Sequence, residues 1–351
     1  MFRRAMTLIV ASALLVALAA GGMFLPVPYL VASPGIALNT IGEVEGEQVI
    51  RVEGEESYQH DGELTMVTVQ YAGGPGTRMD MFTVLSAWLS PNQAVLPEEA
   101  LFPPDRSLEE ISESQNLQMD DSQTAATAAA LNEMGVDYQI QSVVVGVGEG
   151  MPAEGELEDG DLITEVDGEP VDGKEETVEQ VSGREPGDPV GLTVLRDGET
   201  EELSLTTAED EEGNAVVGIM IDNEMKFPFD VEIAVGEIGG PSAGMMFALG
   251  ITDRLSAEGL TGGHTIAGTG TIDPNGNVGG VSGVEQKMVS AVQKGAEYFF
   301  VAEENCPHTF QSAASGQVDV VKVDELGDAL DALEKIRAGA GPGDLPICEP
   351  N

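Results

Sequence analysis

The longest apolar stretch of the chain lies near its N-terminus, where Ala5 to Leu25 include no charged side chain. A helix of that length spans roughly 30 Å, the thickness of the hydrocarbon core of a bilayer. Arg3 and Arg4 precede the stretch and Glu-rich sequence follows it, which predicts a cytoplasmic N-terminus and an extracytoplasmic body. The small residues Ala17 and Ala19 are spaced as at a signal-peptide cleavage site, so a cleaved signal is the alternative. Because the apolar run continues well past that point, we favour a retained anchor.

Between this stretch and residue 138, the hydrophobic pattern predicts both strands and helices. The segment 26–35 contains three prolines and predicts extended chain. Ser107 and Glu110 form a capping box, which marks the start of a helix. The other expected elements are a strand at 61–70, a helix at 81–90 and an alanine-rich helix at 119–135.

The pattern changes near residue 139, where short β-rich runs alternate with glycine turns. The dipeptide Asp197-Gly198 is a hairpin signal with a predicted strand on each side. We therefore predict a compact β-dominated unit over 139–207 and interpret the acidic sequence AEDEEGN, at 208–214, as a linker.

From residue 227 onward, predicted strands alternate with predicted helices, which indicates a layered α/β domain. The expected strands are VEIAVGEI (231–238), HTIAGTGTID (264–273) and AEYFFVAEE (296–304). The expected helices are SAGMMFALGITDRL (242–255), VEQKMVSAVQK (284–294) and DELGDALDALEKIRAG (324–339).

The charge balance excludes one large class of partners. The chain has 62 acidic and 15 basic residues and a net charge of −47, so a nucleic acid would be repelled. The acidity runs through the whole chain, which favours a saline habitat or a strongly solvated surface over one cationic partner. No segment carries a phosphate-binding or dinucleotide-binding glycine motif, so neither ATP nor NAD is indicated and we expect no cofactor.

Cys306 and Cys348 are the only cysteines, and the chain has no CxxC or HExxH motif. We therefore predict no zinc site. An extracytoplasmic body favours a disulfide between the two cysteines, and two unrelated buried thiols are the alternative.

The sequence GGPSAG at 239–244 places Ser242 at the start of an apolar helix. Backbone N–H groups at a helix N-terminus lack intrahelical partners and stabilise negative charge, so they suit an oxyanion that forms beside a serine nucleophile. The small residues around Ser242 let a substrate backbone approach closely. The alternative is that Ser242 only caps the helix.

A serine nucleophile needs a base, and Lys287 is the better candidate. A predicted capping box of Ser282 and Glu285 places Lys287 one turn into its helix, at the edge of the buried face. Burial and a helix N-terminus both lower the pKa of an amine, so a neutral Lys287 can accept the serine proton. Lys294 is interpreted as a surface residue near the end of the helix, and His264 is the alternative base.

Three segments together resemble the proteolytic domain of Lon-type proteases: GGPSAGMMFALGI, IAGTGTIDPNGNVGGVSGVEQK and FFVAEENC. That family uses a Ser-Lys dyad. The resemblance implies that Ser242 is the nucleophile and Lys287 the general base, and that Thr269 lies close to the lysine. We expect Gly240, Ala243 and Thr269 to support the dyad and the oxyanion.

The segment VVVGVGEGMPAEGELEDGDLITEVDGEPV resembles a bacterial PDZ domain, most specifically in GDLI followed by VDG. PDZ domains bind an extended peptide as an added strand. MDDSQTAATAAALNEMG resembles a helix of the Lon-type fold, which implies that the PDZ domain is inserted into the protease region; three successive independent domains are the alternative. The expected boundaries are 1–29 for the cytoplasmic stub and anchor, 30–138 for the first part of the protease region, 139–207 for the PDZ domain and 208–351 for the catalytic domain.

Taken together, the anchor, the PDZ segment and the Lon-type segment resemble the membrane-anchored Lon-like proteases of Gram-positive bacteria. The resemblance implies an α/β proteolytic domain with a PDZ insert, acting without ATP on unfolded, flexible or short extracytoplasmic chains. Relatives of the Lon type commonly assemble as rings, so the resemblance also implies a homo-oligomeric ring. ATP-dependent Lon enzymes often have an acidic residue where this chain has Gly239, and Gly-Glu-Ile where it has Gly270-Thr271-Ile272. Because of these departures, the details of substrate gating are not carried over from that family. The rival functions are a non-catalytic PDZ scaffold and a Ser242–His264 hydrolase.

Overall fold

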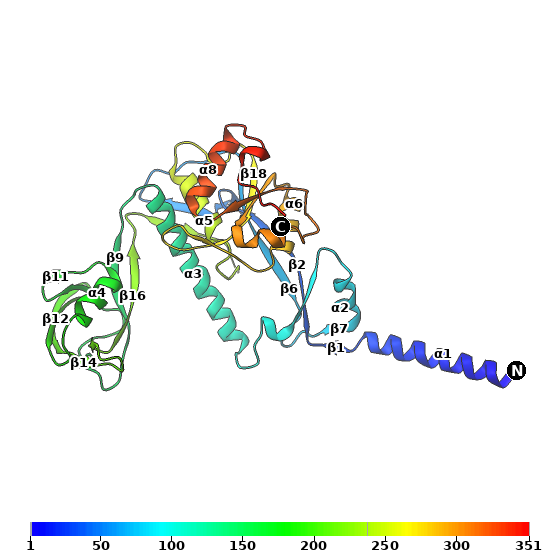
Figure 1. Cartoon of the computed structure of the whole chain (residues 1–351), viewed down its shortest axis with the longest axis horizontal. Helices are drawn as coiled ribbons and strands as arrows, with labels where there is room; N and C mark the ends of the chain where they lie inside the picture. Colours follow the sequence, from blue (N-terminus) through cyan, green and yellow to red (C-terminus); the bar gives the residue numbers. More distant parts are fainter. Residues whose placement is uncertain (1, 237, 351) are drawn as a thin grey trace. The chain divides into compact units, whose positions relative to one another are not determined.

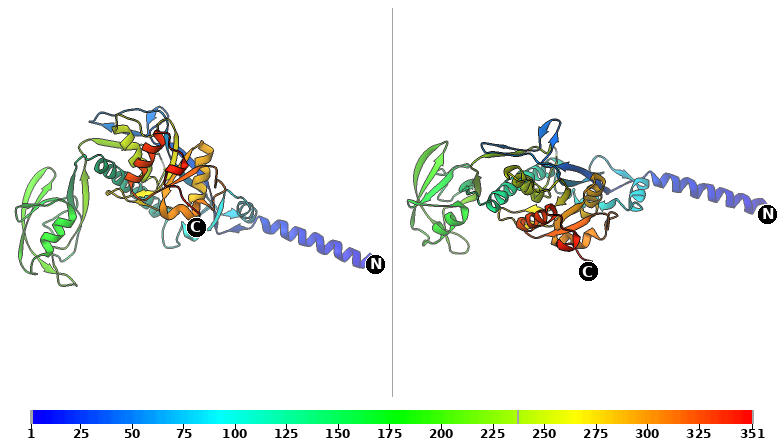
Figure 2. Two further views of the ribbon diagram at one scale, coloured as in Figure 1. Left: turned by 45° about the horizontal axis from the view of Figure 1, so that its top comes forward. Right: turned by 90° about the horizontal axis from the view of Figure 1, so that it is seen from above.

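The structure is a computed structural model that describes residues 2–236 and 238–350, so Met1, Glu237 of the GEIGGPSAG segment, and Asn351 lie outside the described part. The chain divides into two compact units, which can be followed by colour in Figures 1 and 2. The smaller unit is Val136–Pro228, and the larger unit comprises the sequence on both sides of it. Strands from both sides pair directly in one sheet, so the smaller unit is an insertion in the larger one.

Helix α1, Phe2–Met23, is the N-terminal apolar element. Its segment Arg4–Met23 has a mean hydropathy of 2.1 and none of it is buried within the protein. By length and composition this helix is suited to cross a membrane, and a signal sequence has the same features.

A six-stranded sheet organises the larger unit. The four strands β22, β21, β18 and β6 are parallel, and β2 and β8 extend the sheet antiparallel to their neighbours. In the order in which they lie side by side, the strands are β22 (Asp319–Val323), β21 (Tyr298–Ala302), β18 (Thr265–Thr269), β6 (Glu63–Ala72), β2 (Tyr29–Asn39) and β8 (Ala94–Pro97).

Side chains alternate between the two faces of this sheet, and each face has its own core. Phe300 packs in one core, whereas its neighbours Phe299 and Val301 pack in the other. The first core contains α3 (Leu108–Glu133), α5 (Gly244–Leu255) and α8 (Leu326–Arg337). The second contains α6 (Val284–Lys294). The larger unit is therefore a layered α/β fold in which α5 and α6 cover opposite faces.

Smaller elements complete the larger unit. The remaining helices are α2 (Met81–Trp88) and α7 (Cys306–Thr309), with 3-10 turns at Glu98–Ala100, Glu303–Asn305 and Pro342–Asp344. The short strands are β1 (Pro26–Val27), β3 (Glu43–Val44), β4 (Glu47–Gln48), β5 (Ile50–Glu53), β7 (Met79–Asp80), β17 (Asp230–Ile233), β19 (Thr271–Ile272) and β20 (Val278–Gly279).

The segment 26–35 is extended as predicted, and most of it belongs to β2, a strand of the main sheet. Two helix predictions differ from the structure. One uninterrupted helix, α3, replaces the two helices predicted after Ser107 and over 119–135, because no glycine or proline breaks the sequence from 108 to 133. The predicted capping box of Ser282 and Glu285 is wrong: Gly283, with a φ of 70°, is the N-cap of α6 without a side-chain cap, and Glu285 bonds His308 instead.

The smaller unit is built on a second sheet, with the strand order β13-β12-β10-β9-β16 and β11 paired with β10. Its strands are β9 (Gln139–Val147), β10 (Leu162–Val166), β11 (Glu169–Pro170), β12 (Pro189–Arg196), β13 (Glu199–Thr206) and β16 (Ile219–Lys226). Helix α4, Gly173–Ser182, packs on this sheet and was not predicted.

This unit extends beyond the boundary predicted at residue 207. Strand β16 pairs with β9 along Ile219 to Lys226, so the sheet is incomplete without a strand that lies within the predicted catalytic domain, 208–351. The acidic segment 208–214 is also not a free linker. It forms the turn between β14 (Ala208–Glu209) and β15 (Ala215–Val216), where Asp210 accepts hydrogen bonds from the backbone of Glu212 and Asn214.

Cys306 and Cys348 form a disulfide, with their Cα atoms 5.5 Å apart. The bond joins the start of α7 to the C-terminal segment, whose Cys348 N–H donates to the carbonyl of Val320 in β22. Both cysteines are buried in the core that contains α6. The disulfide therefore links the C-terminal segment covalently to α7, within the core that also contains α6, the helix that carries Lys287.

We predict that Cys306→Ser combined with Cys348→Ser lowers the free energy of unfolding. The bridge closes a sequence separation of 42 residues. The loss of this closure corresponds to about 4 kcal/mol of chain entropy in the unfolded state. Urea unfolding of the detergent-solubilised full chain measures the difference, and the single variant Cys348→Ser should lose a similar amount. An unchanged urea midpoint in the double variant, or two reactive thiols in unreduced native protein, would contradict the prediction.

Candidate active site

Ser242 lies in the turn just before α5 and is partly exposed. Gly240 has a φ of 90°, a conformation that glycine adopts without strain. A Cβ at Gly244 would lie 2.8 Å from the Ser122 hydroxyl, so only glycine fits at the first residue of α5. The Ser122 hydroxyl donates to the carbonyl of Pro241 at 3.2 Å. Helix α3 thus holds the turn from the side.

The backbone donors around Ser242 are not equivalent. The N–H of Gly240 donates to the carbonyl of Gln115 at 3.0 Å, so the hydrogen of that group is not available to an oxyanion in this structure. Within the described part of the chain, the N–H groups of Ser242 and Ala243 have no hydrogen-bond acceptor. Both precede the first turn of α5, where the helix dipole is positive. These two groups are the ones suited to bind a developing negative charge.

Lys287 lies in the second half of the first turn of α6, and its side chain is only 4% exposed. Burial lowers the pKa of its amino group from 10.5 to about 8, because the charged form loses its hydration. Among the residues that the structure describes, no carboxylate forms an ion pair with Lys287 to offset this cost. A substantial fraction of the amine is therefore neutral in mildly alkaline solution.

Thr269 connects Lys287 to the turn of Ser242. The Thr269 hydroxyl donates to the carbonyl of Ser242 at 2.9 Å and accepts a hydrogen bond from the Lys287 amino group at 3.1 Å. Since its single hydrogen is committed to that carbonyl, Thr269 cannot donate to the lysine. The lone pair of a neutral Lys287 must therefore point away from Thr269. The N–H of Gly270 also donates to the Ser242 carbonyl, at 3.0 Å, which fixes the peptide after the serine.

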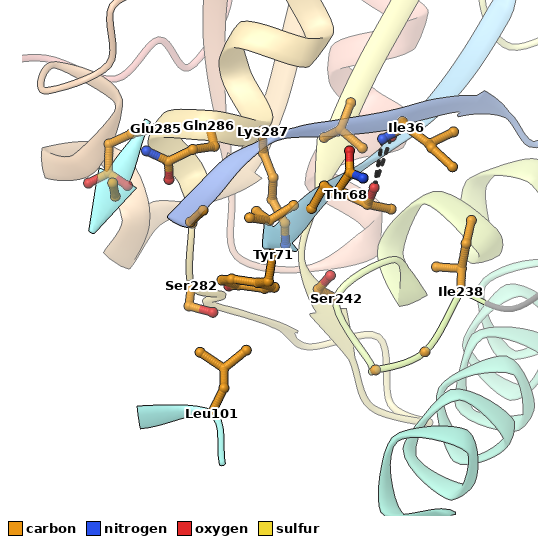
Figure 3. A pocket seen from close by; sticks show the side chains of 18 of the residues that line it. Ile36, Thr68, Tyr71, Leu101, Ile238, Ser242, Ser282, Glu285, Gln286 and Lys287 are labelled. Carbon is orange, nitrogen blue, oxygen red and sulfur yellow. Dashed lines mark hydrogen bonds between the residues drawn. The ribbon is translucent and has the colours of Figure 1, made fainter. Parts of the chain in front are cut away.

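Ser242 and Lys287 line one pocket of about 1100 Å³ in the larger unit. Figure 3 shows their side chains approaching one another from different elements, with Tyr71 beside them. No hydrogen bond joins the Ser242 hydroxyl to Lys287 among the described residues. Catalytic hydrogen bonds are often longer without substrate and shorten in the substrate complex.

The pocket has a wall that sequence reasoning missed. It consists of β6 residues 66–71 and the segment from Pro91 to Leu101, both far from Ser242 in sequence. The sequence feature that marks part of this wall is the absence of charged residues between Met81 and Pro97, because so acidic a chain has few uncharged stretches of that length. The sequence alone did not indicate which elements that stretch adjoins.

The alternative base, His264, is not among the residues that line the pocket. Its Nδ1 lies 2.9 Å from the carboxylate of Glu297, and its ring packs edge-on against Tyr298. His60 and His308 are also absent from the pocket lining. Lys294 pairs with Glu63 at 3.3 Å at the surface, as expected for a residue in the last turn of α6. Lys287 is thus the titratable amine that shares the pocket with Ser242.

The described residues do not include a set of side chains suited to bind a metal ion. No group of three His, Cys, Asp or Glu side chains among them is placed to hold one. The chemistry that this pocket can support is acyl transfer by a hydroxyl, an amine and backbone N–H donors.

Comparison with known proteins identifies both units. Residues 116–207 match the PDZ domain family, and residues 217–334 match the Lon protease (S16) C-terminal proteolytic domain. Among curated proteins, none matches the chain significantly.

Solved structures similar to the chain include PDZ domains. The PDZ domain of an SdrC-like protein from Listeria innocua is 34% identical and the match covers 23% of this chain and 92% of that one, with a TM-score of 0.22. The corresponding domain from Listeria monocytogenes is 27% identical over 23% and 85% of the two chains, with a TM-score of 0.22. A solution structure from Geobacillus thermodenitrificans is 32% identical over 22% and 92%, with a TM-score of 0.21.

Because these TM-scores are low, the assignment depends on the two family matches. The S16 match includes Ser242 and Lys287, which line the pocket, and Thr269, which hydrogen-bonds to both of them. The chain therefore combines a PDZ domain with a Lon-type (S16) C-terminal proteolytic domain.

Proposed function

We propose that the protein is an ATP-independent, membrane-anchored serine endopeptidase that uses Ser242 as nucleophile and Lys287 as general base. The observation that carries the proposal is the buried Lys287 amine, held by Thr269 in the pocket that Ser242 lines. The PDZ unit selects extracytoplasmic proteins or peptides, as the ability of such domains to bind extended peptides suggests.

The reaction begins when the neutral Lys287 amine removes the proton of the Ser242 hydroxyl. The serine oxygen attacks the carbonyl carbon of the scissile peptide, and the carbonyl oxygen becomes an oxyanion. The free N–H groups of Ser242 and Ala243 then donate to this oxyanion. Lys287, now an ammonium ion, returns its proton to the leaving amine as the C–N bond breaks. Water, deprotonated by the same amine, hydrolyses the acyl-enzyme and restores Ser242.

A buried lysine is a better base near neutral pH than an exposed lysine, because its pKa is lower. An ammonium with its ordinary pKa of 10.5 holds its proton too firmly to serve as a base near neutral pH. Burial brings the pKa to about 8, close to the pH at which a base works best. Thr269 retains the amine in place without donating to its lone pair. The lone pair is thereby left for Ser242.

We predict that Ser242→Ala and Lys287→Met each reduce cleavage of an unfolded protein by about 10³-fold or more, since each removes a reacting group. The assay uses the reconstituted full chain without ATP, at low and at molar salt. The control His264→Ala should retain cleavage within about twofold, because His264 does not line the pocket and its contact with Glu297 is partly exposed. Full activity of Lys287→Met would refute the Ser-Lys assignment. Inactivity of the folded wild type at both salt concentrations would favour a PDZ scaffold.

The pH dependence of kcat/KM should follow the deprotonation of the Lys287 amine. We expect kcat/KM to rise about tenfold per pH unit below the Lys287 pKa, which lies at about 8, and to level off above it. Thr269→Val removes an acceptor that stabilises the ammonium more than the amine, so the apparent pKa should fall while the plateau rate decreases. Thr269→Ser, which retains the hydroxyl, should restore both. An unshifted profile in Thr269→Val would show that the threonine has only a structural role.

The buried amine should also lower stability at neutral pH. The folded pKa of about 8 lies below the ordinary 10.5, so both states are protonated below pH 8 and the full desolvation cost applies there. Lys287→Met should raise the free energy of unfolding at pH 7 by at most about 3 kcal/mol. This advantage should shrink as pH rises from 8 to 10.5, where the unfolded lysine also loses its proton. A less stable variant with no pH dependence in that interval would contradict the burial argument.

A further inference from the structure

Helix α2, Met81–Trp88, presents large apolar side chains to its surroundings. Phe82 is 54% exposed, Trp88 is 72% exposed, and Leu89, the C-cap, is 78% exposed. Leu85 lies on the same side, whereas Val84 and Ala87 face the interior. The helix is therefore apolar on both its inner and its outer face. A helix that is hydrophobic all round is typically enclosed by protein or lipid.

The sequence around α2 is unusual for this chain. No charged residue occurs from Met81 to Pro97, although the chain has a net charge of −47. Trp88 is also the only tryptophan. Exposed aromatic and aliphatic side chains that gather in one place mark an interaction surface more often than isolated exposed residues do.

Backbone pairing holds this surface at the end of the apolar helix α1. The N–H of Met81, the first residue of α2, donates to the carbonyl of Leu25 at 3.0 Å. Just before it, β7 pairs antiparallel with β1, so that Asp80 lies opposite Pro26 and Met79 opposite Val27. Figures 1 and 2 show α2, β7 and β1 next to the end of α1. Phe24 and Leu25 are themselves exposed and continue the apolar surface.

We propose that α2 is a second membrane contact, with Phe82, Leu85, Trp88 and Leu89 lying in the interfacial region of the bilayer that α1 spans. Lipid is the occupant because the surface is continuous with a helix of membrane-spanning length and composition. Tryptophan prefers the lipid–water interface, where its ring is apolar and its N–H reaches polar groups. The strongly acidic protein cannot rely on anionic headgroups for attraction, so an uncharged surface suits a hydrophobic contact.

This contact places the pocket close to the lipid. The segment that follows α2 lines the pocket at Pro91 and Gln93, and β8 within it joins the main sheet through β2. A helix fixed at the bilayer surface would therefore hold one pocket wall near that surface. The proposal depends on retention of α1 and not on the peptidase activity of Ser242.

The sole tryptophan allows a direct test. The full chain with Ser242→Ala, which excludes self-cleavage, is reconstituted in phosphatidylcholine vesicles, and its intact mass confirms that α1 is present. We expect Trp88 emission to fall about twofold in lipids brominated near the headgroup end of the acyl chain and less in lipids brominated at the chain terminus. Equal emission in brominated and unbrominated vesicles, with free quenching by aqueous acrylamide, would overturn the proposal. Processing of the chain to a form without α1 that leaves the vesicles would overturn it as well.

Matched variants separate lipid from a second copy of the chain. Leu85→Ser combined with Leu89→Ser should reduce quenching by brominated lipid about twofold. Val178→Ser, at an exposed apolar residue of α4 in the smaller unit, should leave it unchanged. Phe82→Ser provides the same comparison if the double variant does not fold. Emission that is protected from acrylamide, insensitive to brominated lipid and dependent on the protein-to-lipid ratio would assign the surface to self-association and overturn the proposal.

Discussion

The hydroxyl of Thr269 is the point at which the two halves of the candidate site meet. It donates to the backbone carbonyl of Ser242 and accepts from the amine of Lys287, at the carboxyl end of strand β18. Helices α5 and α6 belong to cores on opposite faces of the sheet, so neither helix alone can bring serine and lysine together. The edge of the sheet beyond β18 is where side chains from both faces converge, as is common for sites in parallel sheets.

Burial of Lys287 then links structure to chemistry. The same desolvation that lowers its pKa towards the working range of a base also opposes folding at neutral pH. The larger unit tolerates this cost because it has two cores and a disulfide beneath α6. A site that carries such a penalty, when hydrophobic residues would pack there without it, is more easily understood as functional than as structural.

Sequence reasoning worked best where the signal is local. Helix α6 spans Val284 to Lys294, as its periodicity predicted. The family resemblance singled out Ser242, Thr269 and Lys287. In the structure, Ser242 and Lys287 line one pocket, and Thr269 accepts a hydrogen bond from Lys287. The features that sequence reasoning missed depend on contacts between residues far apart in the sequence. Strand β16 follows an acidic segment, and only its pairing with β9 places it in the smaller unit. Gly240 fits its turn, yet its N–H is taken by Gln115 of α3, a contact across more than a hundred residues that no local pattern encodes.

The central claim is that Lys287 loses its proton near pH 8 inside the folded protein. The chain has six lysines, so NMR spectra of the full chain labelled with ¹³C at the lysine ε carbons would be simple to interpret. Lys287→Met identifies the resonance of interest by its disappearance. We predict that this resonance titrates with a midpoint of about 8. A midpoint near the ordinary value of 10.5 would contradict the account, because Lys287 would then be a charged residue with no capacity to act as a base near neutral pH.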